Sequence, residues 1–148
     1  MRGLALALAI PAALALTSCS HPRPPAGRWE GTYESADVMI AARVEIEPDG
    51  RVRLSAPDLV GVSPSSDEER AAMHARLADK LAQDWSGVAP REMDFDGTTF
   101  RYPDGVAPRM ILDSATRQIA LFVYLGRGAP LHIRVHAVGN FSDDPWQS

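Results

Sequence analysis

The chain has 148 residues, 45% of them hydrophobic, and a formal net charge of −4 at pH 7. A net negative chain offers no basic field to a phosphate backbone, so this composition argues against nucleic-acid binding. The single cysteine excludes both an intramolecular disulfide and a cysteine metal cluster within one chain.

Residues 1–18 have the pattern of a secretory signal peptide. Arg2 supplies the positive charge, and an almost unbroken apolar run follows from Leu4 to Leu16. This run is shorter than the roughly 20 apolar residues that a transmembrane helix needs. We therefore expect the segment to direct export and to be removed from the mature protein.

The next motif, Leu16-Thr17-Ser18-Cys19, resembles the lipobox of bacterial lipoproteins: an aliphatic residue, two small residues and the cysteine that is acylated. The resemblance implies lipid on the Cys19 thiol, cleavage just before Cys19 and acylation of its new amino group. Several acyl chains suffice for stable membrane attachment. Because Ser20 rather than aspartate follows the cysteine, the family pattern favours the outer membrane of the bacterial cell envelope, with the protein facing the periplasm.

Three further segments are expected after the signal peptide. Residues 19–26 comprise the lipidated cysteine and a proline-rich tether, because prolines favour an extended chain. Residues 27–140 form one β-rich globular domain, long enough to bury a core without disulfides. Residues 141–148 form a polar C-terminal tail.

The domain opens with a strand over residues 27–33, in which Trp29 and Tyr33 share one side. The start of this strand, Gly27-Arg28-Trp29, resembles the G-x-W opening of lipocalins and related small bacterial barrels. That resemblance implies an antiparallel barrel whose interior carries an apolar ligand.

A hairpin follows, with residues 38–47 and 51–56 on either side of the turn Pro48-Asp49-Gly50. Counting outward from the turn gives one apolar face and one solvent-facing face with opposite charges across the strands. The predicted pairs are Ile46 with Val52, Val44 with Leu54 and Ala42 with Ala56, and on the other face Glu47 with Arg51 and Glu45 with Arg53.

A single helix is predicted from Ser66 to about Trp85. Ser66-Asp67-Glu68-Glu69 has the spacing of a capping box, in which the Ser66 hydroxyl and the Glu69 carboxylate each accept from a free backbone amide. One narrow stripe of the helix is apolar, and we expect it to pack on the sheet of the same domain. The stripe consists of Met73, Leu77, Ala78, Leu81, Ala82 and Trp85.

The remaining chain reads as short antiparallel strands. Residues 91–95 and 98–102 bracket Asp96-Gly97, a two-residue turn signal that would place Met93 opposite Phe100. The later strands are expected at residues 109–113, 118–125 and 130–138.

These elements predict an α+β fold that is mainly β. The architecture is a curved antiparallel sheet or small β-barrel of about eight strands, with one packed α-helix inserted after the third strand. Whether the sheet closes into a barrel is left open by the pattern.

The last hairpin carries the candidate ligand-binding residues. Centring it on Gly128 pairs Leu125 with Leu131, Val123 with Ile133 and Leu121 with Val135 in the core, and places Tyr124 beside His132, Phe122 beside Arg134 and Ala120 beside His136 on the other face. Phe122, Tyr124, His132, Arg134 and His136 have the mixture of rings and charge that could bind a small anionic or amphipathic molecule. The alternative interpretation is an ordinary outer sheet surface.

Neither a metal site nor catalysis is indicated. Four residues of strand separate His132 and His136 by about 13 Å, too far for one ion. The chain lacks a nucleophile elbow, a catalytic cysteine, a zinc-protease motif and a phosphate loop. We therefore expect no cofactor and no enzymatic activity.

Two functional hypotheses remain. In the first, the protein is a membrane-anchored lipoprotein of the cell envelope that acts as an interaction or structural accessory and docks an envelope protein. In the second, it is a lipocalin-like module that binds a small amphipathic or anionic ligand.

Overall fold

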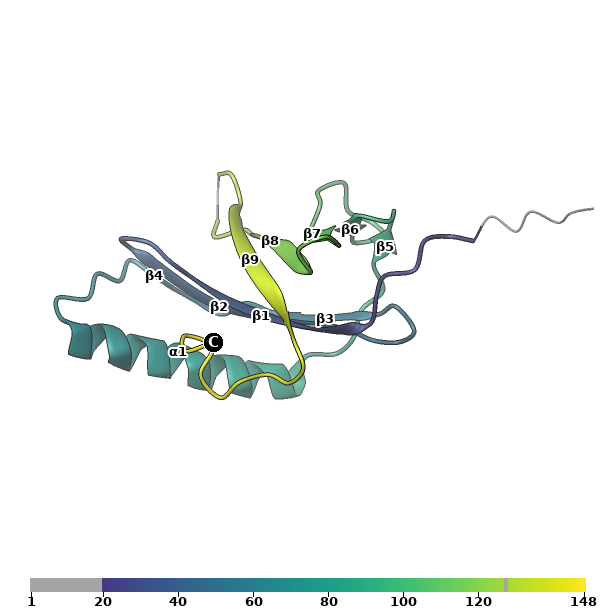
Figure 1. Cartoon of the computed structure of the whole chain (residues 1–148). Helices are drawn as coiled ribbons and strands as arrows, with labels where there is room; N and C mark the ends of the chain where they lie inside the picture. The colour runs from purple at the N-terminus through teal and green to yellow at the C-terminus, as the bar shows by residue number, and fades with distance from the viewer. Residues whose placement is uncertain (1–19, 127) are drawn as a thin grey trace, which may run out of the picture.

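The computed structural model describes residues 20–126 and 128–148, so the expected signal peptide and Cys19 lie outside the described residues. The described chain forms one antiparallel sheet that curls into a half-barrel, with a single helix against it (Figure 1). The expected α+β, mainly β fold is thereby confirmed.

The sheet has nine strands in the spatial order β3-β2-β1-β9-β8-β7-β6-β5, with β4 also paired to β2. The elements are β1 (Gly27–Glu34), β2 (Val38–Ile46), β3 (Val52–Ser55), β4 (Asp58–Val60), α1 (Asp67–Gly87), β5 (Asp94–Phe95), β6 (Thr99–Arg101), β7 (Met110–Asp113), β8 (Gln118–Val123) and β9 (Leu131–Val138). The sequence pattern predicted about eight strands because the three residues of β4 carry no alternation of their own.

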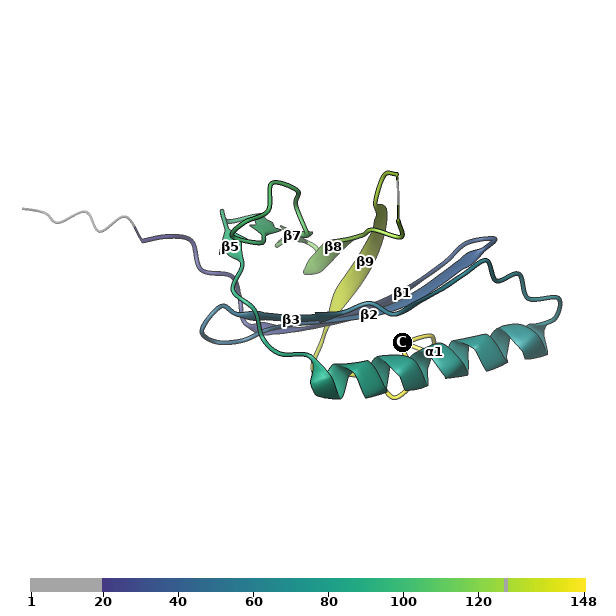
Figure 2. The same ribbon diagram turned by 180° about the vertical axis from the view of Figure 1, so that it is seen from behind.

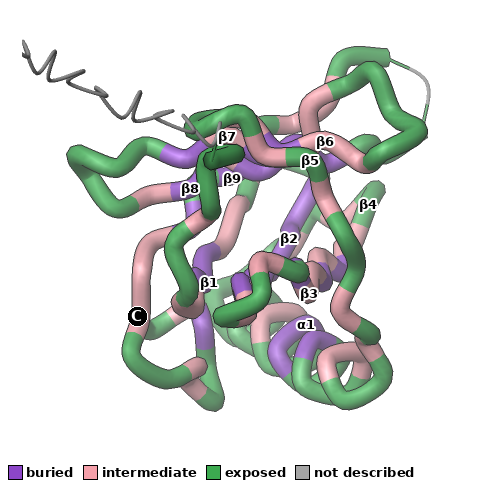
Figure 3. The backbone as a smooth tube through the Cα atoms, turned by 90° about the vertical axis from the view of Figure 1, so that its right-hand side faces the viewer, coloured by how far each residue is buried: buried purple, intermediate pink, exposed green. Residues whose placement is uncertain are grey.

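The molecule is layered. Helix α1 lies against the outer side of β1–β3, and β5–β9 curl over the opposite side of those strands (Figures 1 and 2). The concave side between the two halves of the sheet is filled by apolar side chains, and the stretches coloured as buried in Figure 3 lie on both halves of the sheet. The largest fully buried apolar residues of this core are Phe100, Ile40, Ile46, Met110, Ile119, Leu121 and Ile133.

One backbone bridge joins the two edges of the half-barrel. Val52 in β3 and Arg91, just before β5, exchange two hydrogen bonds, with N···O distances of 2.8 and 2.9 Å. The curled sheet is therefore connected at this one point, although β3 and β5 do not form a ladder there.

The β2–β3 hairpin has the predicted register, with Ile46 opposite Val52, Val44 opposite Leu54 and Glu45 opposite Arg53. The prediction of a solvent-facing side is wrong for much of β2. Met39 and Ala41 on that side are fully buried beneath α1, and Arg43 is only 6% exposed.

Helix α1 begins as predicted but with a different partner for Glu69. The Ser66 hydroxyl accepts from the Glu69 backbone amide at 3.1 Å. The Glu69 carboxylate instead accepts from the amide and hydroxyl of Ser65, and these bonds lower the pKa of that carboxyl. The apolar stripe packs on the sheet as expected, with Leu77, Ala78 and Leu81 buried.

The β5–β6 hairpin corrects a predicted pairing. Phe95, not Met93, lies opposite Phe100, and the two rings are 4.5 Å apart. The turn is centred one residue later than predicted, on Gly97 and Thr98: the Asp96 backbone amide donates to the Thr99 carbonyl at 3.3 Å, and the Asp96 carboxylate accepts from the backbone amides of Thr98 and Thr99. Gly97 adopts a φ of 104° within this turn, a conformation that favours glycine.

A close approach at Gly31 allows β1 to cross β9. A Cβ at Gly31 would lie 2.5 Å from the Arg134 carbonyl oxygen. The two strands pair only from Arg28 to Glu30 and then diverge, so the sheet bends sharply where its two halves meet.

The last residues, expected as a polar tail, pack on the outer side of β1 and β2 beside α1 (Figure 1). The Phe141 ring lies 5.0 Å from the Trp85 ring in an edge-on arrangement, and the Arg43 guanidinium lies over it at 5.0 Å. Trp146 stacks on His74 of α1 at 3.9 Å. The C-terminal segment thus completes the outer layer of the domain.

Beneath that segment lies a buried ion pair. Arg43 Nε donates to the fully buried Glu30 carboxylate at 3.0 Å. Ser142 adds a hydrogen bond to each member of the pair: its hydroxyl donates to the Glu30 carboxylate, and its carbonyl accepts from the Arg43 guanidinium at 2.7 Å. Every charge of the pair is therefore matched by a hydrogen bond, as a buried pair requires.

Among the described residues, no helix combines the length and the apolar character needed to cross a bilayer.

Candidate functional site

The expected lipid site, Cys19, lies outside the described residues, but the tether that follows it is described from Ser20 onward. The tether runs past the tips of two hairpins. A Cβ at Gly50 would lie 3.7 Å from the Pro24 ring, and a Cβ at Gly97 would lie 3.8 Å from Pro22. The described part of the tether therefore leaves the domain on the side of the half-barrel that bears β5 (Figure 1).

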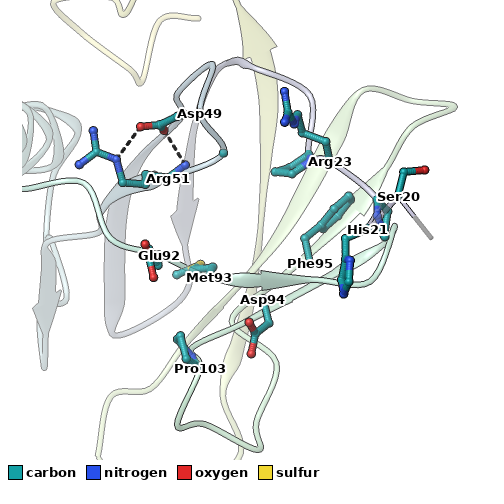
Figure 4. Close-up of a pocket in the computed structure, with 13 residues that line it drawn as sticks. Ser20, His21, Arg23, Asp49, Arg51, Glu92, Met93, Asp94, Phe95 and Pro103 are labelled. Carbon is teal, nitrogen blue, oxygen red and sulfur yellow. Dashed lines mark hydrogen bonds and ion pairs between the residues drawn. The ribbon is translucent and has the colours of Figure 1, made fainter. Parts of the chain in front are cut away.

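An open cleft of about 1030 Å³ lies between the tether and the domain (Figure 4). Its lining residues are Ser20, His21, Pro22, Arg23, Pro24, Asp49, Gly50, Arg51, Glu92, Met93, Asp94, Phe95 and Pro103. Acidic, basic and apolar groups alternate around it, so the cleft has no single chemical character.

Asp49 and Arg51 form the ordered polar contact of this cleft. The Arg51 amide donates to Asp49 at 3.0 Å, and its guanidinium donates to the same carboxylate at 2.7 Å. These bonds lower the pKa of Asp49 and raise the pKa of Arg51. They hold the β2–β3 turn in shape, which accounts for both residues without a ligand.

The β8–β9 hairpin brings the predicted ligand-binding residues together in a different register. Phe122 lies opposite His132, Ala120 opposite Arg134 and Gln118 opposite His136. The predicted pairs are therefore wrong by two residues, although each residue keeps its predicted face. The loop between the two strands is longer than predicted, because the pairing ends at Val123 and Leu131. It contains Gly126 and Gly128, both at positive φ, and is not one of the two- or three-residue turns that fix a hairpin register.

These residues lie on the outer surface of the half-barrel. The Phe122 ring meets the His132 ring edge-on at 4.4 Å and is 8% exposed. His132 and Arg134 are exposed, His136 is half-buried, and Tyr124 is 42% exposed. They line neither the cleft at the tether nor a second cleft of about 440 Å³ between β4 and α1.

The structure adds three residues to this surface that sequence reasoning did not single out. The Arg91 guanidinium lies over the Tyr102 ring at 4.2 Å, and the Arg109 guanidinium lies 5.7 Å from both the Tyr102 and the Tyr124 rings. Arg109 Nε is buried and has no hydrogen-bond partner in the described residues. Arginines held over aromatic rings in this way gain from cation–π attraction.

We call this surface the arginine–tyrosine face. It consists of Arg91, Tyr102, Arg109, Tyr124, His132 and Arg134. None of its three arginines forms an ion pair within the described part of the chain. The alternation of the last hairpin found Tyr124, His132 and Arg134, but no sequence signal could have added the other three members, because they lie in separate segments with no common spacing.

Within residues 20–126 and 128–148, no cluster of three or more histidine, cysteine, aspartate or glutamate side chains could hold a metal ion. Comparison with known proteins adds no assignment, since no family model, curated protein or solved structure matches the chain. Any functional interpretation therefore depends on the chain itself.

Proposed function

We propose that this protein is a membrane-anchored lipoprotein of the bacterial cell envelope, attached through Cys19, that acts as an interaction or structural accessory. The observation that carries the proposal is the sequence Leu16-Thr17-Ser18-Cys19 after a short apolar run. A proline-rich tether follows it directly, and the folded domain begins at Gly27. This order suits a globular domain held at a membrane by acyl chains.

An interaction role is favoured over a ligand-carrying role by the contents of the half-barrel. The concave side, where a lipocalin-like barrel would hold its ligand, is packed with apolar side chains such as Phe100 and Met110, both fully buried. The candidate ligand residues around Arg134 are instead on the outer surface. A surface of that kind suits contact with a larger partner better than enclosure of a small molecule.

A Cys19→Ala variant tests the anchor. We expect the wild-type protein to sediment with membranes and to enter the detergent phase, because acyl chains hold it there. The variant should remain unprocessed or be released in soluble form. A Ser18→Ala variant keeps a small residue before the cysteine and serves as the matched control. If Cys19→Ala leaves processing and membrane association unchanged, the lipoprotein proposal is refuted.

Crosslinking in intact cells tests the interaction role. A photocrosslinking residue placed in turn at the exposed Val106 and at the exposed Gln83 of α1 should capture a specific envelope protein at one of the two positions, and the other position serves as the comparison. If every position on the domain yields no specific product, the accessory role is refuted while the anchor can still stand.

A further inference from the structure

We infer that the arginine–tyrosine face lies on the surface of the membrane that holds the protein, and that α1 points away from that membrane. This inference rests on the proposed lipid anchor and adds an orientation to it. The occupant of the face is a bilayer surface that contains anionic lipid.

The position of the tether is the first observation. Ser20 directly follows Cys19, and the tether leaves the domain beside β5, on the side of the molecule away from α1 (Figures 1 and 3). Residues 19–26 can span at most about 25 Å, at about 3.1 Å per residue for an extended proline-rich chain. A bilayer that holds Cys19 is therefore near β5–β9 and far from α1.

The distribution of exposed apolar side chains is the second observation. Four large hydrophobic residues are notably exposed in the described chain, and three of them lie in the two loops on the β5–β9 side. Those three are Val106, 93% exposed, Tyr124, 42% exposed, and Leu125, 37% exposed; the fourth is Val60 at the end of β4. The loops that carry the three, between β6 and β7 and between β8 and β9, project from the top of the molecule in Figure 1.

The unpaired arginines are the third observation. The protein as a whole has a net charge of −4, yet Arg91, Arg109 and Arg134 on this face have no ion-pair partner among the described residues. Acidic residues do lie near them: Glu92 and Asp94 follow Arg91 in the chain, and Asp113 at the end of β7 interacts electrostatically with Arg134. The three guanidinium groups are therefore not committed to an ion pair within the described chain, and each can interact with an anionic headgroup.

Arginine and tyrosine together match the chemistry of a membrane interface. The Arg109 guanidinium is held between the Tyr102 and Tyr124 rings, so apolar ring surface and charge are presented side by side. Tyrosine is enriched at the level of lipid headgroups because one end of its side chain is apolar and the other polar. Each cation near an anionic bilayer adds about 1 kcal/mol of attraction.

Site-specific fluorescence on the full lipidated protein tests the orientation. Under the proposal the only native thiol, Cys19, carries lipid, so an environment-sensitive dye can be attached at Val106→Cys or, as the matched control, at Gln83→Cys in α1. Both variants are reconstituted into phosphatidylcholine vesicles with or without phosphatidylglycerol, and quenching by a lipid-borne quencher is measured. We expect strong quenching at position 106 with phosphatidylglycerol present, and little at position 83.

Charge variants sharpen this test. Arg134→Gln should weaken the docked state about fivefold, the equivalent of one cation at an anionic surface, whereas Arg76→Gln on exposed α1 should leave quenching at position 106 unchanged. High salt should also reduce quenching at position 106, because it screens the attraction between the arginines and anionic lipid. Equal quenching at positions 106 and 83, or quenching indifferent to phosphatidylglycerol, would overturn the inference.

The same preparation separates the two proposals. If the intact mass shows no lipid and the protein does not remain with vesicles, the anchor proposal fails. The proposed orientation then fails too, because it depends on the anchor. If lipid is present and the protein remains with vesicles but position 106 is not quenched, only the orientation fails.

Discussion

Glu30 and Arg43 form a buried ion pair, so a single substitution there should have a large energetic consequence. Both are buried between the sheet and the C-terminal segment, and Ser142 supplies a hydrogen bond to each. Glu30→Gln removes the charge and leaves Arg43 without its counter-ion. We expect a loss of about 3–5 kcal/mol in the free energy of unfolding, measured by urea denaturation.

Glu45→Gln is the matched control for that measurement. Glu45 lies on the same face of β2 and pairs with Arg28 at 3.3 Å, but both side chains are accessible to water. Pairs of this kind contribute at most about 1 kcal/mol. Equal losses for the two variants would contradict the account of a buried and fully hydrogen-bonded pair.

Gly31 is predicted to tolerate no side chain. In Gly31→Ala the new Cβ would sit 2.5 Å from the Arg134 carbonyl oxygen, which belongs to backbone and cannot rotate away. Pushing β1 from β9 should cost about 1–3 kcal/mol of stability. Gly139→Ala, where the added Cβ meets nothing within 4 Å, should be close to neutral in the same thermal-melting experiment. Similar melting temperatures for the two variants would show that the crossing of β1 and β9 is not tight.

Asp96 gives the β5–β6 turn a pH dependence of known sign. The backbone amides of Thr99 and Thr98 donate to its carboxylate and lower its pKa below the ordinary value of 3.8. A lowered pKa in the folded state means that the carboxylate stabilises the fold above about pH 4, and that this contribution is lost as the pH falls through the folded-state pKa. An NMR titration should therefore find Asp96 titrating below 3.8, and a value above that would contradict the turn geometry.

At the scale of single residues, the sequence identified those whose partners are close along the chain. The Ser66 cap and the Glu45–Arg53 pairing follow from spacing alone, and both are present. The role of Glu69 was mistaken because Ser65, one residue earlier, offers both an amide and a hydroxyl. The Arg91–Tyr102–Arg109 contacts were missed because they depend on how distant strands align.

Among the elements, turn length decided which pairings could be predicted. The β2–β3 turn is short and has a recognisable glycine, so its register followed from counting. At the β5–β6 turn the Asp96 carboxylate accepts from two backbone amides and the turn is centred one residue later than predicted, which places Phe95 opposite Phe100. The long β8–β9 loop imposes no register, so the alternation of the strands could predict the faces but not the partners.

The packing of the C-terminal segment on the domain could not be predicted from its sequence. Its composition is polar, yet Phe141, Ser142 and Trp146 each contact a residue of the β1, β2 and α1 layer. A chain that ends at Asn140 would leave Glu30 and Arg43 uncovered. We expect that truncation to lower the free energy of unfolding by more than about 3 kcal/mol.

A chain that ends at Trp146 is the control for the truncation, because it retains all three contacts. It should unfold at nearly the same urea concentration as the full chain. If both truncated chains are as stable as the parent, the segment is an appendage and its contacts do not stabilise the domain.

For the whole molecule, the alternation of apolar and polar residues was sufficient to predict the class. A mainly β sheet with one packed helix follows from periodicity, and it is observed. The curvature of the sheet was also predicted, but its extent and the single bridge from Val52 to Arg91 did not follow, because both depend on the crossing at Gly31 and on contacts far apart in sequence. The same holds for the candidate site. The sequence predicted which face of the sheet its residues occupy, but not the partners that they contact on other strands.

The proposed attachment to a membrane through lipid on Cys19 can be decided by a mass spectrum of the N-terminal peptide of the mature protein. Protein purified from membranes is digested with trypsin, which cuts after Arg28 but not between Arg23 and Pro24. We expect a peptide from Cys19 to Arg28 that carries the added mass of acyl chains. A mature protein that begins at another residue, or a Cys19 peptide without added mass, would contradict it.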